Sequence, residues 1–369
     1  MRTKVGIVGA GPAGLTLGML LQRRGVDSII VEARSQDYVE QRVRAGVLEQ
    51  NTVDLLHGIG VGDRLAREGL EHHGIFLRRR GEQTYVDMTA LTGRAITVYG
   101  QQEVVKDLIA ARTGDLHFET PVASVDPGAG TIDLEDRGTI ECDVIAGCDG
   151  FHGVCRAAVP DRREIEYEWP FAWLGILARA QPATKELIYA WHEHGFALYS
   201  MRSDTISRLY LQVPADADLE AWPDDRVWEE LETRLGAVNR GEIIDKGITP
   251  MRSFVCTPMQ HERLFLCGDA AHIVPPTGAK GLNLAVNDAR LLDAALAADD
   301  TAGYTERALR RVWRAQDFSS YMTQLLHDLG GGPFQQQLQL SRLDYIARSE
   351  HAARSLAENY VGLPAEPEF

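Results

Sequence analysis

An arginine and two hydroxyl-bearing side chains are spaced so that they could hold a carboxylate group. Ser200 and Arg202 lie two residues apart in a strand-like stretch, so both side chains point to one face of the strand. Tyr210 lies in the following stretch, where polar and apolar residues alternate as in a half-buried strand. A guanidinium binds a planar carboxylate through two parallel hydrogen bonds, and the two hydroxyl groups can add donors. Each residue alone would belong to an ordinary polar sheet face, but the three together on one hairpin predict a carboxylate site.

Two tyrosines and two adjacent histidines are further candidates, although each has an ordinary structural interpretation. Tyr189 lies in an apolar strand-like stretch and Tyr360 follows an amphipathic helix, where both would usually be packing residues. His72 and His73 are neighbours, and spacing alone does not choose between them. The remaining histidines have no spacing typical of metal ligands, so we expect no metal site.

The N-terminal segment has the spacing of a dinucleotide-binding turn. Gly9, Gly11 and Gly14 form a GxGxxG motif that follows an apolar strand and opens a helix. The first glycine permits a tight turn, the second lets a pyrophosphate approach the backbone, and the third lets helix and strand pack closely. The next strand ends at Glu32, which would accept hydrogen bonds from an adenosine ribose. This unit predicts a bound dinucleotide but does not distinguish NAD from FAD.

The order of the expected elements predicts a protein of the α/β class with mixed α+β character, in which domains are built from segments that are not continuous in the sequence. A nucleotide-binding unit is interrupted by strand-rich segments, and helices dominate the C-terminal part. The expected ranges are a nucleotide-binding domain at 1–71, 99–175 and 253–285, a substrate-binding sheet domain at 72–98 and 176–252, and a C-terminal helical interface region at 286–369.

The amino-acid composition of the chain argues against some classes of binding partner. The net charge is −15 and the pI about 5.2, which argues against nucleic acid and anionic membranes, since both are polyanions. The five cysteines are odd in number and lack a CxxC pair, which favours buried, reduced thiols. No apolar run is long enough to span a membrane and no signal peptide is recognisable, so we expect a cytoplasmic protein.

Three motifs together resemble the fingerprints of the single-component flavoprotein aromatic hydroxylases. They are the GxGxxG motif, Cys148-Asp149-Gly150 and Gly268-Asp269. Within this family the chain is most similar to the enzymes that hydroxylate 4-hydroxybenzoate, and the similarity covers essentially the whole chain. The segments that carry it are 42–50, 99–101, 268–283 and 358–364.

The resemblance implies a fold, a reaction and its cofactors. The fold is a Rossmann-like FAD-binding domain with an antiparallel-sheet substrate domain and C-terminal helices. The reaction is hydroxylation of 4-hydroxybenzoate at C3 to 3,4-dihydroxybenzoate, through a flavin C4a-hydroperoxide, with O2 and either NADPH or NADH as co-substrates. The residues that it assigns to the cofactor are Gly9, Gly11, Ala13, Gly14, Glu32, Arg42, Val43, Arg44, Ala45, Gly46, Val47, Gln101, Asp149, Asp269, Lys280, Leu282 and Asn283.

The resemblance also implies roles around the substrate. Tyr189 and Tyr360 would form a relay that removes the phenolic proton, and His72, favoured here over His73, would pass it to solvent. A buried relay spares the site from opening to water while the substrate becomes a phenolate, the form whose ring carbon attacks the peroxide oxygen. The carbonyl of Pro276 would contact the substrate oxygen or the hydroperoxide. The full substrate-binding set is Tyr189, Ser200, Met201, Arg202, Tyr210, Pro276 and Thr277.

The nicotinamide donor has no second GxGxxG motif, so the resemblance assigns it to surface residues. These are Arg34, Tyr38, Arg42, Arg44, His152, Arg156 and Arg252. Ala33-Arg34 departs from the best-known family pattern of an arginine followed by a glutamine, which leaves the choice between NADPH and NADH open. The resemblance further implies a homodimer. Two alternatives remain: a related flavin hydroxylase of another hydroxy- or aminobenzoate, and a non-catalytic FAD-binding redox protein.

Overall fold

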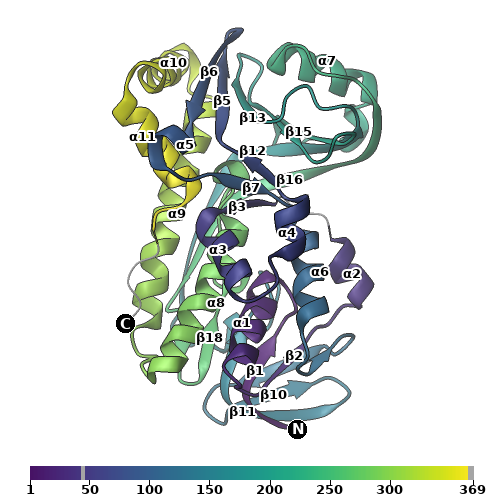
Figure 1. Ribbon diagram of the computed structural model, residues 1–369, viewed down its shortest axis with the longest axis vertical. Helices are drawn as coiled ribbons and strands as arrows, with labels where there is room; N and C mark the ends of the chain where they lie inside the picture. Colours follow the sequence, from purple (N-terminus) through teal and green to yellow (C-terminus); the bar gives the residue numbers. More distant parts are fainter. Residues whose placement is uncertain (43–45, 365–369) are drawn as a thin grey trace.

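A mostly parallel sheet forms the lower lobe of the molecule in Figure 1. The computed structural model describes residues 1–42 and 46–364. Strands β1, β2, β8, β11 and β18 pair in parallel, while β17, β10 and β9 add antiparallel strands at one side. In spatial order the path is β17 (Gln260–His261), β18 (Leu264–Leu266), β11 (Gly138–Gly147), β1 (Arg2–Val8), β2 (Ser28–Val31) and β8 (Leu116–His117), with β10 (Thr131–Leu134) and β9 (Val122–Asp126) beside β11.

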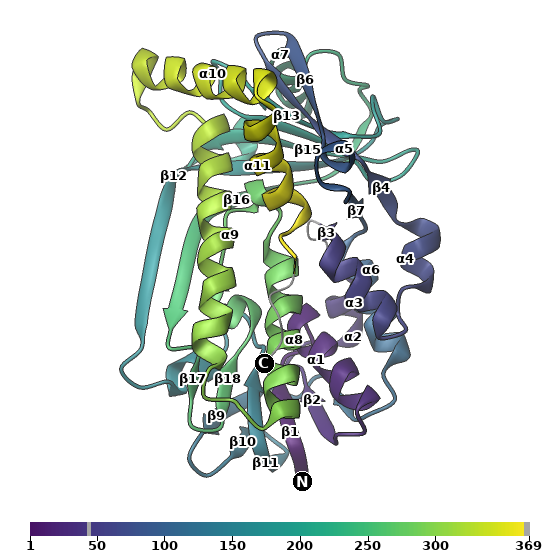
Figure 2. The same cartoon turned by 60° about the vertical axis from the view of Figure 1, so that its left-hand side comes forward.

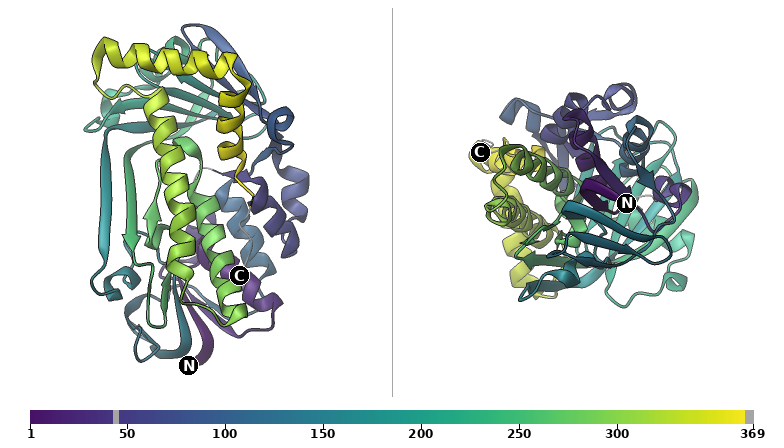
Figure 3. Two further views of the ribbon diagram at one scale, coloured as in Figure 1. Left: turned by 90° about the vertical axis from the view of Figure 1, so that its left-hand side faces the viewer. Right: turned by 90° about the horizontal axis from the view of Figure 1, so that it is seen from below.

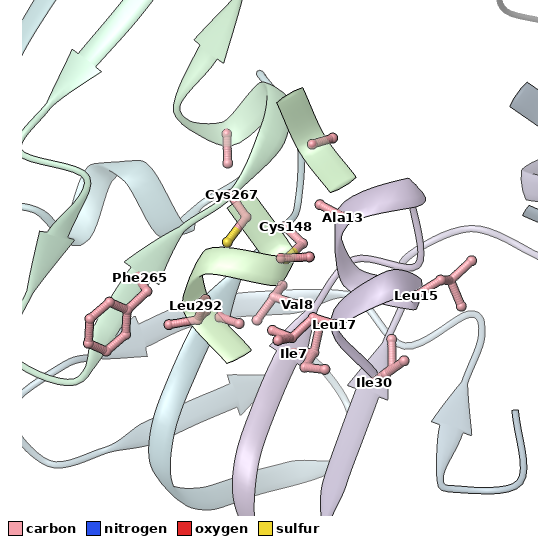
Figure 4. Packing of buried hydrophobic residues seen from close by; sticks show 14 of the residues in the cluster. Ile7, Val8, Ala13, Leu15, Leu17, Ile30, Cys148, Phe265, Cys267 and Leu292 are labelled. Carbon is pink, nitrogen blue, oxygen red and sulfur yellow. The ribbon is translucent and has the colours of Figure 1, made fainter. Parts of the chain in front are cut away.

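Helices α1 (Pro12–Arg23) and α8 (Gly281–Ala298) pack against each other over this sheet. Figure 4 shows the core between them, where Ile7 and Val8 of β1 meet Leu17 of α1 and Leu292 of α8. The apolar runs of the central strands are buried on both faces, as expected for parallel strands covered by helices. All five cysteines are buried free thiols, as predicted from their number and surroundings.

A second sheet forms the upper lobe, and its strand order places substrate-domain segments side by side. Its pairs are antiparallel except for one parallel pair, β13 with β5, so the expected antiparallel sheet differs from the structure at that point. In spatial order the strands are β19 (His272–Ile273), β16 (Glu242–Thr257), β12 (Arg163–Arg179), β15 (Ser207–Pro214), β14 (Ala197–Met201), β13 (Leu187–Trp191), β5 (Gly74–Arg79) and β6 (Glu82–Asp87).

The two faces of the upper sheet are covered differently. Helix α7 (Asp224–Leu235) buries one face with Val227, Trp228 and Leu231. Side chains of α9 (Tyr304–Leu326), α10 (Gly332–Arg348) and α11 (Glu350–Val361) share the core of the other face, together with a three-stranded sheet. That small sheet consists of β3 (Val47–Glu49), β7 (Ile96–Val98) and β4 (Leu70–His72) in antiparallel order. The remaining helices are α2 (Gln36–Gln41), α3 (Gln50–Gly58), α4 (Asp63–Glu68), α5 (Met88–Thr92) and α6 (Gln101–Ala111), with short 3-10 turns η1 (Cys155–Ala158), η2 (Leu219–Ala221), η3 (Gly268–Ala270) and η4 (Pro276–Gly278).

Strands β12 and β16 form a two-stranded ribbon that runs from the lower lobe into the upper one (Figure 2). The expected domain boundaries at 175/176 and 252/253 lie inside these two strands. The register of the ladder between them shifts at two places, between Glu168 and Ala172 and again between Leu177 and Ala178 near its far end. Pro170 lies in the first interruption, where the lack of an N–H donor costs no ladder hydrogen bond. Two further views in Figure 3 show α8 and α9 side by side along the length of the molecule.

The confirmed fold class is therefore a mixed α/β arrangement with C-terminal helices. Within residues 1–42 and 46–364, no helix is long and apolar enough to cross a membrane. The same residues contain no group of three or more His, Cys, Asp or Glu side chains that could hold a metal ion.

Candidate active site

The glycine turn between β1 and α1 has no room for side chains at two positions and open space at a third. Gly9 has φ +106°, and a Cβ there would lie 2.3 Å from the carbonyl oxygen of Cys148. A Cβ on Gly14 would lie 2.0 Å from the carbonyl oxygen of Gly9. A Cβ on Gly11 would meet no atom within 4 Å, and this glycine precedes α1, while Ala13 is buried behind it. Open space at a helix N-terminus is what a pyrophosphate requires.

Glu32 lies at the end of β2, as the motif predicted, and its carboxylate is held by backbone donors. One oxygen accepts from the N–H of Ala10 at 2.9 Å, and the other from the N–H of Arg34 at 2.9 Å. Each carboxylate oxygen can accept more than one hydrogen bond, so capacity for ribose hydroxyl groups remains. The backbone contacts fix the carboxylate beside the glycine turn.

Asp149 follows β11 and has one buried oxygen without a partner. Its Oδ2 accepts from the N–H of Cys155 at 2.9 Å, whereas Oδ1 has no hydrogen bond to any residue that the structure describes. Burial raises the pKa of this carboxyl group. A buried acceptor without a donor is costly, so this site fits a ligand that brings one.

The Gly268-Asp269 turn is held from behind by α8. Asp288, fully buried in that helix, accepts from the N–H of Gly268 at 2.9 Å and lies 2.6 Å from Nε2 of His272. Gly268 has φ +63°, a conformation that favours glycine. The side chain of Asp269 is exposed at this turn, where a bound group can reach it.

Lys280 is engaged by the protein rather than presented to a ligand. Its Nζ lies 2.6 Å from Oε1 of Glu49 and also donates to the carbonyl oxygens of Asn359 and Tyr360. Burial lowers the pKa of Lys280, and the Glu49 carboxylate offsets part of that effect. The ammonium group therefore ties α8 to the end of α11 and has no free donor for the cofactor.

The side chain of Asn283 is likewise used within the protein. Its Oδ1 accepts from the N–H of Glu49 at 2.9 Å, and its Nδ2 donates to the carbonyl oxygen of Val47 at 3.0 Å. What remains for a cofactor at this point is the backbone, because the first N–H groups of a helix have no intrahelical partner. Leu282 lies in that first turn of α8 and is buried.

The loop before α8 is packed tightly against α9. Thr277 is fully buried, and its hydroxyl accepts from that of Thr323 at 3.0 Å. A Cβ on Gly278 would lie 2.6 Å from Oγ of Ser319. Pro276 begins the short turn η4 and is only half-buried. Its carbonyl oxygen accepts from the N–H of Ala279 at 2.9 Å.

The segment before β3 is described only in part. Arg42 is exposed, whereas Val43, Arg44 and Ala45, which were also predicted to bind the cofactor, lie outside the described residues. Gly46 is buried, and a Cβ there would lie 2.0 Å from the carbonyl oxygen of Tyr99. Gln101 begins α6 and is half-buried.

The residues predicted to form a carboxylate site lie together on the upper sheet. Arg202 follows β14 directly, and its Nη1 is buried without a hydrogen-bond partner among the described residues. Burial lowers the pKa of the guanidinium, and Tyr210 beside it offsets part of that effect. Ser200 is buried in β14, with its hydroxyl donating only to the carbonyl oxygen of Met201 at 3.3 Å. Met201, the next residue, points its side chain to the opposite face of the strand.

The two tyrosines meet across the interface between the upper sheet and α11. The hydroxyl oxygens of Tyr189 and Tyr360 lie 2.5 Å apart, and both side chains are about 1% exposed. Burial raises the pKa of both phenols well above the ordinary value. Tyr189 also lies in one row across the sheet with Tyr210, through Leu198 between them. The tyrosine pair and the carboxylate site therefore share one face.

His72, the last residue of β4, and His73, which follows it, differ in burial. His72 is 1% exposed, and its Nδ1 lies 3.0 Å from Oε2 of Glu186. His73 is exposed, and its Nδ1 contacts the hydroxyl of Thr89 at 3.1 Å. Each histidine has an acidic neighbour, Glu186 for His72 and Glu71 for His73, so the two differ mainly in burial.

Three of the residues expected to bind the nicotinamide donor gather around Phe151. The guanidinium groups of Arg156 and Arg252 each lie 4.8 Å from the centre of its ring, and the ring of His152 contacts its edge. Ion pairs with Glu164 for Arg156 and with Glu166 and Glu168 for Arg252 occupy part of their donors.

The other expected donor-binding residues lie on or beside α2. Tyr38 is 50% exposed, with the guanidinium of Arg34 5.4 Å from the centre of its ring. The hydroxyl of Ser35 caps α2 by accepting from the N–H of Tyr38 at 3.3 Å. This helix and the Phe151 cluster lie on different segments, and the described contacts do not join them.

Two further residues at the site were not among the sequence candidates. Arg208 donates through Nε to the hydroxyl of Tyr210 at 3.3 Å, and its buried Nη1 lies 3.9 Å from Oδ2 of Asp245 but makes no hydrogen bond to any residue that the structure describes. Its place two residues before Tyr210, on the same strand face, is the signal that could have found it. Glu186 could not be found from spacing, because it approaches His72 from another part of the chain.

The chain is similar to a known protein family, to named flavin hydroxylases and to solved structures. A model of the FAD binding domain family matches residues 2–319. The p-hydroxybenzoate hydroxylase of Acinetobacter baylyi is 50% identical, over 99% of this chain and 96% of that protein. The 3-amino-4-hydroxybenzoate 2-monooxygenase of Streptomyces cremeus is 28% identical, over 84% of this chain and 82% of that protein. The crystal structure of p-nitrophenol 4-monooxygenase from Pseudomonas putida superposes with a TM-score of 0.83 at 16% identity, covering 99% of this chain and all of that one, which shows a shared fold.

Proposed function

The chain belongs to the FAD binding domain family, and on this premise we propose that it hydroxylates 4-hydroxybenzoate at C3 to 3,4-dihydroxybenzoate, consuming O2 and NAD(P)H. The proposal rests on one face of the upper sheet, which carries a candidate group for a carboxylate and a candidate pair for a phenol. Arg202 is half-buried and has a buried Nη1 without a hydrogen-bond partner among the described residues, and Tyr189 with Tyr360 forms a buried hydroxyl pair. A benzene ring with a carboxylate at one end and a phenol at the other fits both ends at once.

Bound FAD would supply the redox chemistry, taking reducing equivalents from the nicotinamide and activating O2 for transfer of one oxygen atom to the ring. The glycine turn and Glu32 would hold its adenosine and pyrophosphate half. Asp149, Asp269 and the backbone N–H groups that begin α8 would hold the rest. The open space at Gly11 and the unpartnered Oδ1 of Asp149 support this assignment.

The residues of this chain would bind, orient and deprotonate the substrate. Arg202 would take the carboxylate through its fork, with Ser200 and Tyr210 donating further hydrogen bonds. Tyr189 would accept the phenolic proton while giving its own to Tyr360. Because burial raises the pKa of both tyrosines, neither is ionised on its own at neutral pH. The pair can therefore transfer a proton without either tyrosine remaining ionised, and His72 would pass the proton to solvent.

The other expected assignments are proposed on the same basis. Thr277 and the Pro276 carbonyl would border the substrate, and the exposed residues of α2 with the Phe151 cluster would receive the nicotinamide donor. The exposed Arg34 supports use of both NADPH and NADH rather than strict dependence on one.

A related hydroxylase of another hydroxy- or aminobenzoate is the second candidate. The relative from Streptomyces cremeus, named for 3-amino-4-hydroxybenzoate, supports it at 28% identity. Both candidates need Arg202, so only a comparison of substrates separates them.

The experiment that tests the proposal measures product against consumed cofactor. The FAD-loaded protein would receive 4-hydroxybenzoate, 3-amino-4-hydroxybenzoate, benzoate, or 4-hydroxybenzyl alcohol, with NADPH or NADH. We expect one molecule of 3,4-dihydroxybenzoate for each NAD(P)H consumed with 4-hydroxybenzoate, and no hydroxylation of the two compounds that lack the phenol or the carboxylate. Equal product from either incomplete compound would contradict the two-ended site. A lack of substrate-stimulated NAD(P)H oxidation would favour a non-catalytic FAD-binding protein.

The three-part domain division and a homodimer are also proposed. The exposed apolar side chains of α10, including Phe334 at 76% and Tyr345 at 62%, support a covered surface there. Light scattering of the purified protein would give the oligomeric state.

A further inference from the structure

We propose that Glu186 is a positioning residue of the proton relay, which holds the proton of His72 on Nδ1 and leaves Nε2 to receive the proton from inside. This inference rests on the proposed function. Glu186 immediately precedes β13 and lies three residues before Tyr189, so one short segment carries both the inner and the outer group of the relay.

The carboxylate of Glu186 is oriented by two donors and faces the histidine with its other oxygen. Oε1 accepts from the N–H of His73 at 3.2 Å and from the hydroxyl of Tyr85 at 3.4 Å. Oε2 lies 3.0 Å from Nδ1 of His72, at an angle that departs from an ideal hydrogen bond. Neither of these two atoms has another partner among the described residues. A small ring rotation would make the contact a charge-assisted hydrogen bond.

The neighbouring titratable groups make Glu186 the carboxylate that acts on His72. On β4 itself, Glu71 is exposed and contacts the other histidine, with 3.6 Å between its Oε1 and Nδ1 of His73. On β6, burial and the Glu186 charge raise the pKa of Tyr85 to about 12, so this phenol donates and stays neutral. Asp87 at the end of β6 accepts from the N-terminus of α5.

The position of the proton on the ring determines what His72 can do. An imidazole with its proton on Nδ1 carries a lone pair on Nε2 and can accept a proton there. The adjacent carboxylate then stabilises the imidazolium that forms, as an acidic partner does for a catalytic histidine. Within the described residues Nε2 makes no hydrogen bond to the protein, so it is available. The Glu186 side chain is 17% exposed, which gives the proton a route to water.

Glu186→Gln removes the negative charge of the side chain but keeps its size and shape. The amide oxygen must take the place of Oε1, because the His73 N–H needs an acceptor. The amide NH2 then faces Nδ1 of His72 and forces the proton onto Nε2, the wrong nitrogen for accepting. We expect proton release on 4-hydroxybenzoate binding, followed with a pH-indicator dye in the FAD-loaded enzyme, to slow about tenfold or more. Substrate affinity should not change.

Rescue by the conservative variant provides a second readout, which a purely structural role would not give. Glu186→Asp keeps the carboxylate, so it should restore part of the release rate that is lost in Glu186→Gln. Glu71→Gln is the matched control, because Glu71 is exposed on β4, the strand that carries His72, and its release rate should equal that of the wild type.

A double variant decides whether Glu186 acts through His72. In a His72→Asn background, Glu186→Gln should add no further slowing. Additive slowing in the double variant, or wild-type release in Glu186→Gln, would overturn the inference while the wild type still makes product. If the wild type makes no 3,4-dihydroxybenzoate, the proposed function falls and this inference with it.

Discussion

Replacing Arg202 by lysine should weaken substrate binding while leaving FAD bound. The buried Nη1 of the guanidinium has no hydrogen-bond acceptor among the described residues. Two N–H groups of a guanidinium can donate parallel hydrogen bonds to the two oxygens of a carboxylate. A lysine ammonium keeps the charge but loses one member of the pair. A hydrogen bond to a charged group contributes roughly 1.5–3 kcal/mol. The dissociation constant for 4-hydroxybenzoate should therefore rise about tenfold to about a hundredfold.

The assay is a titration of the FAD-loaded protein with 4-hydroxybenzoate, followed by the change in flavin absorbance. Arg226→Lys is the matched control, because Arg226 is exposed on α7 and contacts the ring of Trp222 on the opposite side of the sheet. The control should bind substrate like the wild type. An affinity in Arg202→Lys within about threefold of the wild type, a loss below roughly 0.7 kcal/mol, would refute the carboxylate assignment.

The melting temperature provides a second, independent test of the role of Arg202. A half-buried cation whose buried Nη1 has no acceptor among the described residues costs free energy, so Arg202→Met should not lower the melting temperature of the substrate-free protein and is expected to raise it. Substrate stabilises the wild type by about 2.7 kcal/mol at a hundredfold excess over the dissociation constant. That gain should disappear in Arg202→Met. A strongly destabilised substrate-free variant would show that Arg202 has a protein partner.

Three further changes test the relay, the donor site and the core. Tyr189→Phe should leave the fold intact but uncouple the reaction, with hydrogen peroxide replacing hydroxylated product in a peroxidase-linked assay; full coupling would contradict the relay. Arg34→Ala should lower kcat/KM for NADPH more than for NADH; a strong NADPH preference that survives would place the phosphate contact elsewhere. His327 accepts from Trp173 through Nε2, and burial lowers its pKa to about 3. Its contribution to stability is present above the unfolded pKa near 6.5 and lost as pH falls toward 3, by about 1.4 kcal/mol per unit; denaturant midpoints at pH 7.5 and 5.5 should therefore differ more in the wild type than in His327→Gln, and equal differences would contradict this.

Local patterns predicted the elements that depend on nearby residues. The alternation through Arg208 and Tyr210 became β15, and the GxGxxG spacing became a turn in which Gly9 and Gly14 leave no space for a Cβ. These features arise from the periodicity of strands and from steric limits at single turns, both of which are visible in a short window.

Features that depend on distant partners could not be read in this way. The cofactor assignment of Lys280 and Asn283 gave no sign that their side chains are held around Glu49, more than 230 residues away in sequence. A lysine in a glycine-rich loop gives no local sign that its charge is already paired. The contact of Glu186 with His72 and the parallel pairing of β13 with β5 likewise follow from tertiary packing.

The ribbon of β12 and β16 has a consequence for how the molecule can be divided. The 17 residues of β12 cover roughly 55 Å of chain at the usual rise of a strand. Any cut between the lobes must sever both strands in mid-ladder and leave their backbone donors and acceptors unpaired, which invites aggregation. Neither lobe is therefore suited to expression as a separate fragment, and melting should occur as one cooperative transition. Relative motion of the lobes must be a bend of this ribbon, and the interruption around Pro170 is the place where it can act as a hinge.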